Sequence, residues 1–538
     1  MKKLLSVVFV VSLIFLCATV CAAMTVVLCG DANNDGAVDT KDVLAARLYI
    51  AELSDSIYFD GADANSDMVI NTKDVLVIRR IVAELDPISS RTLADETGTG
   101  TQTGTQTVAT TTTQTKPTTT TTKHIAPTIA PTTKPTGVLA TGTVMRIDVD
   151  HAETFSGEVK GDYSSPFNAY LPKSTVDVLK KIVTDPETGL EYYLLGCGRR
   201  VYVDSAVTVK KDGTLTENYL QLADVSVTDD ATVLTLDSTW HIPFQLQLLP
   251  QEYPYSSQMG EYGPKYDVAS FEAEYAELTF YYTTLASGPM DFSDCPVFRS
   301  SVWRQNSDNT YTLKLNLREA GGFYGYSANW VGDQLVLSFK HKTDISKNTD
   351  KKPLAGMTIV VDAGHGGEWS GTYGAIDGVY EKTLTLDYAK TLRTTLEGLG
   401  ATVVMTRTTD VKVELEDVAA LTRKTSPDLF ISIHMDGVDN PDPNGPSVHY
   451  FTEYSYALAK AIVNRMDKLY NSHKETTYRG AKWNPYYVTR ISDCPAVLIE
   501  CGFLTNYEEE TLLLDASFRK EVCAAIAAGV VEFQKNLP

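Results

Sequence analysis

Four ionisable residues in the last third of the chain are of the types that carry out metal-assisted hydrolysis: His365, Glu381, His434 and Glu500. Two imidazoles and one carboxylate form a common ligand set for catalytic zinc and leave a fourth coordination position for water. A metal-bound water ionises near neutral pH, and a second carboxylate can take up its proton and return it to a leaving amine. The residue types therefore predict a zinc hydrolase site.

The elements expected around these residues would bring them together. His365 follows the apolar run TIVVD in a glycine-rich turn, whereas His434 and Glu500 end the runs LFISI and AVLI. Such runs indicate short buried strands, and Glu381 opens a stretch with helical spacing of its leucines. Because the carboxyl ends of strands in an α/β sheet meet at one edge, we expect a shared crevice there, with Glu381 at its rim.

Each of these residues has an ordinary structural explanation when taken alone. A histidine after a strand usually serves as a hydrogen-bonding group, and a glutamate at a helix start commonly complements the helix dipole. Glu500 differs, because a buried carboxylate without a partner is costly. The combination of all four favours a functional site over four separate structural roles.

An internal duplication near the N-terminus supplies a second group of candidate metal ligands. The segment GDANNDGAVDTKDVLAARLYIAEL recurs as ADANSDMVINTKDVLVIRRIVAEL 32 residues later. Oxygen-bearing side chains alternate along both loops, which is the pattern that calcium requires. The predicted ligands of the first calcium are Asp31, Asn33, Asp35, the carbonyl of Ala37, Asp39 and Asp42, and those of the second are Asp63, Asn65, Asp67, the carbonyl of Val69, Asn71 and Asp74.

Both loops differ from those of paired-helix calcium sensors. Each is followed by a single helix, the twelfth residue is Asp instead of Glu, and Met68 stands where the first loop has the turn residue Gly36. A single loop of this kind is usually a solvated turn. Two copies in register, each running into TKDVL, favour calcium binding.

Composition divides the 538 residues into five segments. Residues 1–23 have the basic start, apolar run and small residues of a signal peptide. Residues 30–86 hold the duplication, and the Thr- and Pro-rich residues 94–138 are expected to form a disordered linker. Alternating runs such as YTLKLNLRE predict a β-rich region over 140–350, and strands alternating with helices predict an α/β domain over 355–538.

Charge and cysteine content narrow the class of protein further. The net charge of −21 argues against a nucleic-acid-binding surface. No second apolar span follows residues 1–23, so no stable membrane insertion is expected after cleavage, and the polar segment that follows disfavours a retained anchor. Two of the eight cysteines precede residue 24; the other six are far apart, which is compatible with one or two disulfides or with free thiols.

The duplicated module resembles a type I dockerin across essentially all of residues 30–86. Dockerins attach enzymes to the cohesin domains of cellulosome scaffolds. The resemblance implies a cohesin-bearing scaffold as partner and assigns partner selection to loop positions ten and eleven, which are Thr40, Lys41, Thr72 and Lys73. Because the two copies match, cohesin binding in two orientations is a hypothesis.

The last domain contains, in order, the blocks DAGHGG, YEKTLTLDYAKTL, LFISIH, YRGAK and VLIECGFLTN. Across about 357–534 they resemble the zinc-dependent N-acetylmuramoyl-L-alanine amidases of peptidoglycan. The resemblance implies a mixed sheet flanked by helices and one catalytic zinc. It places the zinc ligands on His365, Glu381 and His434 and the catalytic glutamate on Glu500.

Some positions differ from the family pattern. Met435 and Asp436 follow the second histidine where the family often has Ala-Asn, and Val418 replaces a common Arg. These changes bear on substrate recognition and leave the ligand positions intact. Arg490 is a candidate for binding a substrate carboxylate, with a surface ion pair as the alternative.

Together these features predict a secreted, extracellular peptidoglycan hydrolase, tethered to a scaffold or to the cell surface. The resemblance implies that it cleaves the amide between N-acetylmuramic acid and L-alanine of the stem peptide. One alternative is another zinc hydrolase, either a stem-peptide peptidase or a polysaccharide esterase, and the dockerin-like module favours the latter. A non-catalytic wall-binding module is the other alternative, but such a module would be expected to have lost a ligand or Glu500.

Overall fold

The computed structural model describes residues 25–28, 90–93, 137–156, 170–184, 189–250, 255–260, 263–266, 271–288, 291–474, 476–477 and 479–538. The chain divides into two units, Met1–Thr121 and Thr122–Pro538. The predicted signal peptide, both predicted calcium loops and residues 94–136 of the predicted linker lie outside the described residues.

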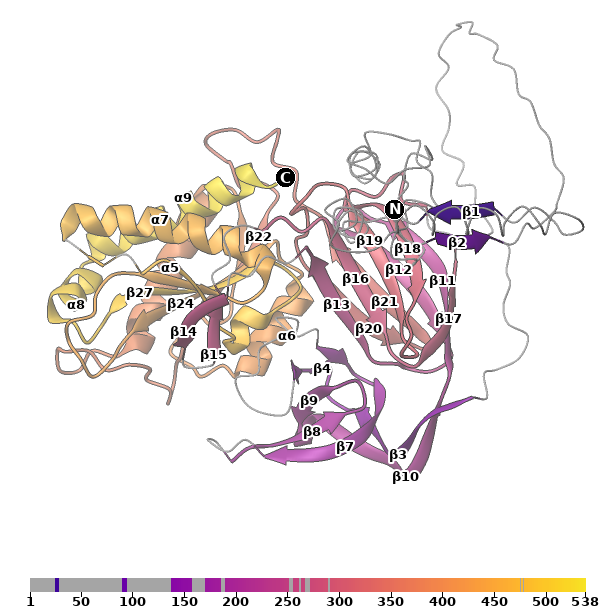
Figure 1. Ribbon diagram of the computed structural model, residues 1–538. Coiled ribbons are helices and arrows are strands. Elements are labelled where there is room, and N and C mark those ends of the chain that lie inside the picture. Colours follow the sequence, from indigo (N-terminus) through magenta and orange to yellow (C-terminus); the bar gives the residue numbers. More distant parts are fainter. Residues whose placement is uncertain are drawn as a thin grey trace, which may run out of the picture. The chain divides into compact units, whose positions relative to one another are not determined.

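The first unit contains an antiparallel pair of strands, β1 (Thr25–Leu28) and β2 (Ser90–Leu93) (Figure 1). Thr25 pairs with Leu93 at one end of the ladder, and Leu28 pairs with Ser90 at the other. These strands flank the duplicated segment in the sequence. Their pairing therefore brings the chain that enters this segment next to the chain that leaves it.

The second unit begins with a six-stranded antiparallel sheet of order β10-β3-β7-β8-β9-β5. Its strands are β3 (Val138–Ile147), β5 (Phe155–Ser156), β7 (Val176–Thr184), β8 (Glu191–Leu195), β9 (Arg199–Tyr202) and β10 (Ala206–Thr216), with the short η1 (Val203–Ser205) between the last two. Beside it, β4 (His151–Ala152) pairs with β6 (Leu171–Pro172).

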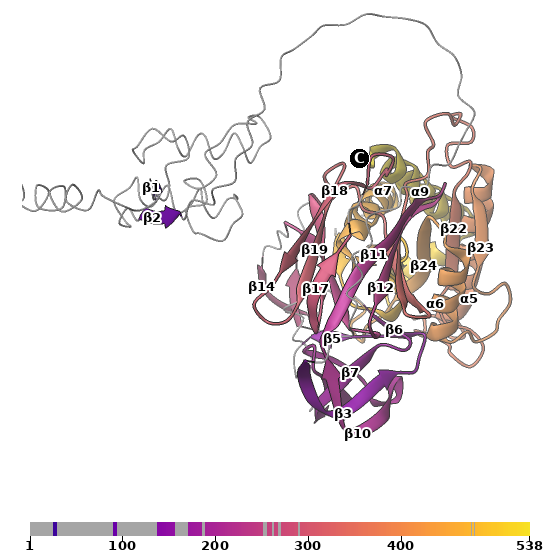
Figure 2. The same cartoon turned by 90° about the vertical axis from the view of Figure 1, so that its right-hand side faces the viewer.

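Two further sheets follow, of order β17-β11-β12-β21-β20 and β13-β16-β19-β18 (Figure 1). Figure 2 shows β11, β12, β17, β18 and β19 after a quarter turn. The first comprises β11 (Asn218–Val227), β12 (Ala231–Ser238), β17 (Thr283–Ser287), β20 (Tyr326–Val331) and β21 (Gln334–Lys340); the second comprises β13 (Phe244–Leu249), β16 (Tyr275–Phe280), β18 (Phe298–Gln305) and β19 (Tyr311–Leu317). The strands β14 (Tyr255–Gly260) and β15 (Gly263–Tyr266) form a separate hairpin.

Alternating side chains hold these two sheets together. Every second residue of β13 and β16 is buried, and leucines of both sheets, including Leu234, Leu278 and Leu337, belong to one apolar core. A period of two is what a sheet with one covered face requires. The prediction of a β-rich middle region is therefore confirmed.

The last part of the chain is built on a mixed six-stranded sheet of order β23-β22-β24-β27-β25-β26. Its strands are β22 (Thr358–Ala363), β23 (Thr402–Met405), β24 (Leu429–Asp436), β25 (Ser447–Tyr450), β26 (Ala481–Trp483) and β27 (Ala496–Phe503). The first four in the order run parallel, whereas β25 is antiparallel to β27. This arrangement confirms the predicted mixed sheet.

Helices cover both faces of this sheet (Figure 1). They are α5 (Glu381–Gly398), α6 (Leu415–Thr425), α7 (Tyr456–His473), α8 (Tyr507–Leu514) and α9 (Ala516–Asn536), with short turns η2 (Glu453–Ser455) and η3 (Tyr487–Arg490). On one face, Ile431 and the residues two positions before and after it in β24 pack in a core with α5, α7 and α9. On the other face, Phe430 and Leu498 pack in a core with α6 and η3. Since both faces are covered, the parallel strands are mainly apolar, and their polar residues are concentrated toward their carboxyl ends.

The β-rich region contacts the α/β domain through the residues between β4 and β5. Arg490 donates a hydrogen bond to Glu153 at 2.8 Å, and its guanidinium carbon lies 5.2 Å from the centre of the Phe155 ring. Phe155 belongs to the same apolar cluster as the core of the α/β domain. A cavity of about 40 Å³ at this contact is lined by side chains that include His151, Arg423 and Asp493.

The five described cysteines, Cys197, Cys295, Cys494, Cys501 and Cys523, are buried free thiols. The sequence allowed either disulfides or free thiols, and the structure shows free thiols for these five residues. The helices of the described part are too short or too polar to cross a lipid bilayer.

Replacing Asp493 with Asn tests the electrostatics of the interdomain cavity. Burial raises the pKa of Asp493 from 3.8 to about 6, so the folded chain holds this proton more tightly than the unfolded chain does. Stability is consequently lost as the pH rises from about 4 through about 6, by at most about 3 kcal/mol. We expect the Tm of Asp493→Asn to exceed that of the wild type by several degrees at pH 7, with the gap closing near pH 4 in scanning fluorimetry.

Asp442→Asn is the matched control, because Asp442 is exposed on a loop. Its Tm should follow that of the wild type at every pH. A Tm difference for Asp493→Asn that does not change with pH would contradict the assignment.

Candidate active site

The turn after β22 places His365 above the carboxyl end of the sheet. His365 has a left-handed backbone with a φ of 63°, which turns the chain sharply away from the strand. The preceding Gly364 lies against the ring of His434: a Cβ built on Gly364 would come within 2.3–2.8 Å of three atoms of that ring. Only glycine therefore allows the two histidines to approach each other, and their ring centres are 4.9 Å apart.

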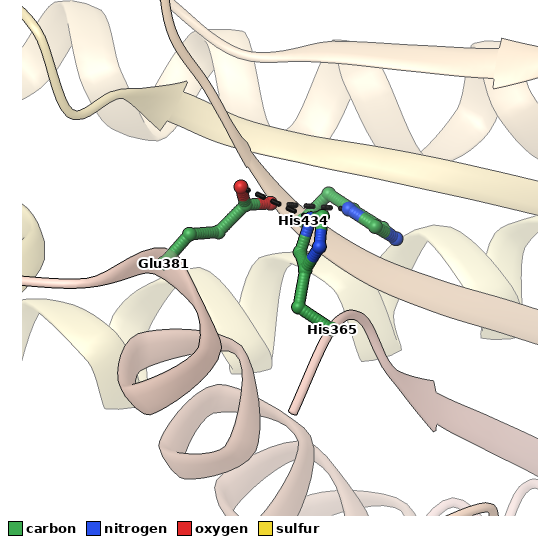
Figure 3. A group of neighbouring side chains, drawn as sticks. All are labelled: His365, Glu381 and His434. Carbon is green, nitrogen blue, oxygen red and sulfur yellow. Dashed lines mark hydrogen bonds and ion pairs between the residues drawn. The ribbon is translucent and has the colours of Figure 1, made fainter. Parts of the chain in front are cut away.

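Glu381, the first residue of α5, bridges the two histidines (Figure 3). Its carboxylate oxygens lie 3.1 Å from Nε2 of His365 and 3.1 Å from Nδ1 of His434. The backbone N–H groups of Thr372 and Met435 donate to the same carboxylate at 2.8 and 3.0 Å. Glu381 is 3% exposed, so its charge is held in place by these contacts and not by water.

The charges in this cluster shift one another's pKa values. Burial alone would raise the pKa of Glu381, but hydrogen bonds from His365 and His434 outweigh it and hold that pKa well below its usual range. Burial alone would lower the pKa of His434, but the hydrogen bond and charge of Glu381 raise it to about 9. The carboxylate of Glu381 therefore favours the protonated form of the His434 imidazole.

Glu500 lies beside this cluster on the neighbouring strand. It is directly opposite His434 in the parallel ladder of β24 and β27. Burial is the main cause that raises the pKa of Glu500 to about 8, and its Oε2 atom is buried without a hydrogen-bond partner among the described residues. The prediction that His434 and Glu500 end their strands is wrong, because the ladder continues to the pair Asp436–Phe503.

A cleft of about 670 Å³ opens over these four residues. Aromatic and polar side chains form its walls, and they include Trp369, Asp436, Tyr486 and Tyr487. Strand-end reasoning did not identify the three aromatic residues, since they lie in turns without a periodic pattern.

Two further residues support the cluster from behind, and sequence reasoning did not single them out. Arg407 donates to the carbonyls of Ala363 and Gly364 at 2.8 and 2.9 Å, which fixes the turn before His365. Asp362 accepts hydrogen bonds from the hydroxyls of Thr406 and Ser432, both at 2.6 Å. The Asp in DAGHGG and the Arg in VVMTR were the available signals, because charged residues at strand ends need partners.

Arg490 lies outside the lining of the cleft. Its ion pair with Glu153 is enclosed, since the two side chains are only 13% and 19% exposed. Arg490 therefore forms an ion pair, as the alternative to carboxylate binding predicted, but this pair is enclosed and does not lie on the surface. The residues predicted to bind calcium and cohesin lie outside the described residues.

His365, Glu381 and His434 fit a divalent metal. One ligand atom from each lies within 4.8 Å of the others; Glu381 begins α5, His434 lies within β24, and His365 follows β22 by two residues. Two imidazole nitrogens with one carboxylate oxygen suit zinc in particular. The positive charge that the imidazoles bring to Glu381 is of the sign that a metal cation would bring.

Comparison with known families and proteins matches two parts of the chain. The family model described as N-acetylmuramoyl-L-alanine amidase matches residues 359–532, and the dockerin type I domain model matches residues 29–83. Probable cell wall amidase LytH of Staphylococcus epidermidis is 35% identical over 215 residues, which are 40% of this chain and 68% of the relative. N-acetylmuramoyl-L-alanine amidase LytC of Bacillus subtilis is 34% identical over 188 residues, 35% of this chain and 38% of the relative.

Solved structures match the same part of the chain. The catalytic domain of CwlV, an N-acetylmuramoyl-L-alanine amidase from Bacillus (Paenibacillus) polymyxa, is 32% identical with a TM-score of 0.31, and the match covers 33% of this chain and 98% of that one. The amidase AmiC2 of Nostoc punctiforme is 33% identical with a TM-score of 0.32, covering 34% of this chain and 99% of that one.

Gly364→Ala tests whether the close approach of the two histidines serves metal binding. The new methyl group would displace the ring of His434, so we expect zinc affinity to fall by about 10- to 100-fold, as when groups that orient metal ligands are changed. Competition with a fluorescent chelator measures this change.

Gly398→Ala is the control, because a Cβ built there meets no atom within 4 Å. It should bind zinc as tightly as the wild type. Unchanged zinc affinity in a folded Gly364→Ala chain would show that His434 is not a ligand.

Proposed function

Since the chain belongs to the N-acetylmuramoyl-L-alanine amidase family, we propose that it hydrolyses the amide between N-acetylmuramic acid and L-alanine of the peptidoglycan stem peptide. The observation that carries this proposal is the convergence of His365, Glu381, His434 and Glu500 at one cleft. A non-catalytic module would not need a buried, unpartnered carboxylate beside a metal ligand set.

In this proposal His365, Glu381 and His434 hold one zinc ion. When bound, zinc supplies Lewis acidity to the scissile carbonyl and to the attacking water. Glu381 also anchors both imidazoles through its two oxygens, so the ligand geometry is set before any ion arrives. The backbone N–H groups of Thr372 and Met435 prevent the carboxylate from turning away.

Glu500 is proposed as the general base and then the general acid. Its Oε2 atom accepts a proton from water as the water oxygen forms a bond to the carbonyl carbon. It then delivers this proton to the alanine nitrogen as the C–N bond breaks, which releases a free amine. Because burial raises the pKa of Glu500, the group can both take up and give back a proton near neutral pH.

The N-terminal dockerin domain supports a proposal about location. We infer that the protein is secreted and binds a cohesin-bearing scaffold, with two calcium ions held by its duplicated loops. The Thr-rich linker would then let the catalytic domain reach peptidoglycan away from the scaffold. Calcium-selective chelation should abolish binding to a cohesin domain in a pull-down; undiminished binding would contradict this proposal.

Digestion of purified peptidoglycan, followed by mass spectrometry, tests the reaction. The wild type should release stem peptides with a free L-alanine amino group and leave glycan strands without peptides. Peptides cut internally, or deacylated polysaccharide, would identify one of the other zinc hydrolases. No release at all would favour a wall-binding module.

Two substitutions separate metal binding from proton transfer. Glu500→Gln should keep zinc and lose about 10²–10⁴-fold in rate, because general acid–base catalysis contributes that much. His365→Ala should lose zinc as well as activity. Metal analysis that finds equal zinc in His365→Ala would contradict the ligand assignment.

A further inference from the structure

Exposed aromatic side chains are concentrated in one segment of the chain, which borders the cleft through Trp369, Gly371 and Thr372. Among the described residues, only Trp369, Tyr373, Tyr380 and Tyr507 are aromatic and at least 36% exposed. The first three all lie between His365 and Glu381, with exposed fractions of 36%, 65% and 37%. Large aromatic groups normally gain free energy by burial, so a cluster left in solvent beside a cleft marks a binding surface.

Trp369 is held rigidly at the cleft. Its backbone exchanges two hydrogen bonds with Gly366, at 2.9 and 3.0 Å, which closes the turn after His365. The ammonium group of Lys412 lies 4.0 Å from the centre of the Trp369 ring and is itself paired with Glu368 and Glu414. Because the ring is fixed in advance, a ligand that binds it does not have to order it.

Tyr373 and Tyr380 form a second group of exposed rings, each next in sequence to a residue that lines the cleft, Thr372 or Glu381. Their ring centres are 5.3 Å apart in an edge-to-face arrangement, and a backbone bridge joins the two residues. Tyr380 immediately precedes Glu381, so this pair is tied to the same helix start that positions the candidate ligand. We refer to Trp369, Tyr373 and Tyr380 as the aromatic strip.

Another part of the cleft is charged where the aromatic strip is apolar. This difference indicates which part of a substrate, peptide or sugar, binds on each side. Asp436 lines the cleft and lies 3.9 Å from the guanidinium of Arg479. Charged groups suit the carboxylates and amines of a stem peptide. The flat apolar face of an aromatic ring instead matches the C–H face of a sugar ring. In a muramoyl amide, sugar and peptide leave the scissile bond in different directions, so the cleft needs one side for each.

We propose that the aromatic strip is the glycan subsite, on which sugar rings of the peptidoglycan strand stack. This inference rests on the proposed function, because it takes the sugar-bearing side of the same amide as its ligand. Stacking over several residues gives a polymeric strand more contact than a single muropeptide has. The enzyme should therefore favour amides on glycan strands over amides on isolated muropeptides.

Calorimetric titration with peptide-free glycan strands tests the subsite directly. The full chain with Glu500→Gln is used as the parent, so that binding is measured without hydrolysis. Adding Trp369→Ala should weaken binding at least tenfold, whereas Trp369→Phe, which keeps a flat ring, should stay within about threefold. Val331→Ala removes exposed apolar surface from the β-sandwich and should leave binding unchanged.

A second pair of substitutions keeps the test decisive if Trp369→Ala does not fold. Tyr373→Ser with Tyr380→Ser removes two rings from the surface and should also weaken glycan binding at least tenfold. Glycan affinity equal to the parent in either folded variant overturns the proposal. Loss of self-association in sedimentation, with glycan affinity kept, also overturns it and identifies the strip as a protein interface.

The outcomes separate this inference from the proposed reaction. If peptidoglycan digestion releases no alanine amine but glycan binding depends on Trp369, the reaction is wrong and the glycan subsite stands. If digestion proceeds and the Trp369 variants bind glycan like the parent, the reaction stands and the subsite is wrong.

Discussion

The buried carboxylate of Glu381 is the constraint on which the rest of the site depends. A charged group that is 3% exposed is tolerated only when opposite charge and hydrogen bonds surround it. Two imidazoles and two backbone N–H groups do so here. They come from the turn after β22, from two neighbouring residues of β24 and from the turn before α5. Helix and sheet must therefore meet at fixed distances, which explains why Gly364 and Arg407 are needed behind them.

Strand patterns in the sequence were sufficient to predict that His365, His434 and Glu500 share one crevice, because parallel strands leave their carboxyl ends little freedom. The bridging position of Glu381 could not be obtained that way, since it depends on how α5 returns to the sheet. The contact between Arg490 and Glu153 could not be predicted from the sequence, for a different reason. Its partners are 337 residues apart, and local periodicity carries no information on such pairs. The aromatic strip likewise lies in a turn, where side-chain exposure follows from tertiary packing.

The β-rich region is more than a spacer before the α/β domain. Phe155 and Tyr192 belong to the core of that domain, so part of its apolar surface is covered from outside its own sheet. Tyr487 lines both the cleft and the interdomain cavity. The guanidinium carbon of Arg490 lies 5.9 Å from the centre of the Tyr487 ring, and Arg490 donates a hydrogen bond to Glu153 of the β-rich region. Glu153 of the β-rich region is thus linked through Arg490 to a side chain that lines the cleft.

The long sequence separation of Glu153 and Arg490 also sets an order of events during synthesis. Chains emerge with the N-terminal end first, and domains generally fold as they become available. The β-rich region can fold while η3 and β27 have not yet been made. Tyr487 of the cleft wall and Glu500 are made only after the β-rich region. The catalytic cleft therefore cannot form before β27 has been made, because β27 carries Glu500.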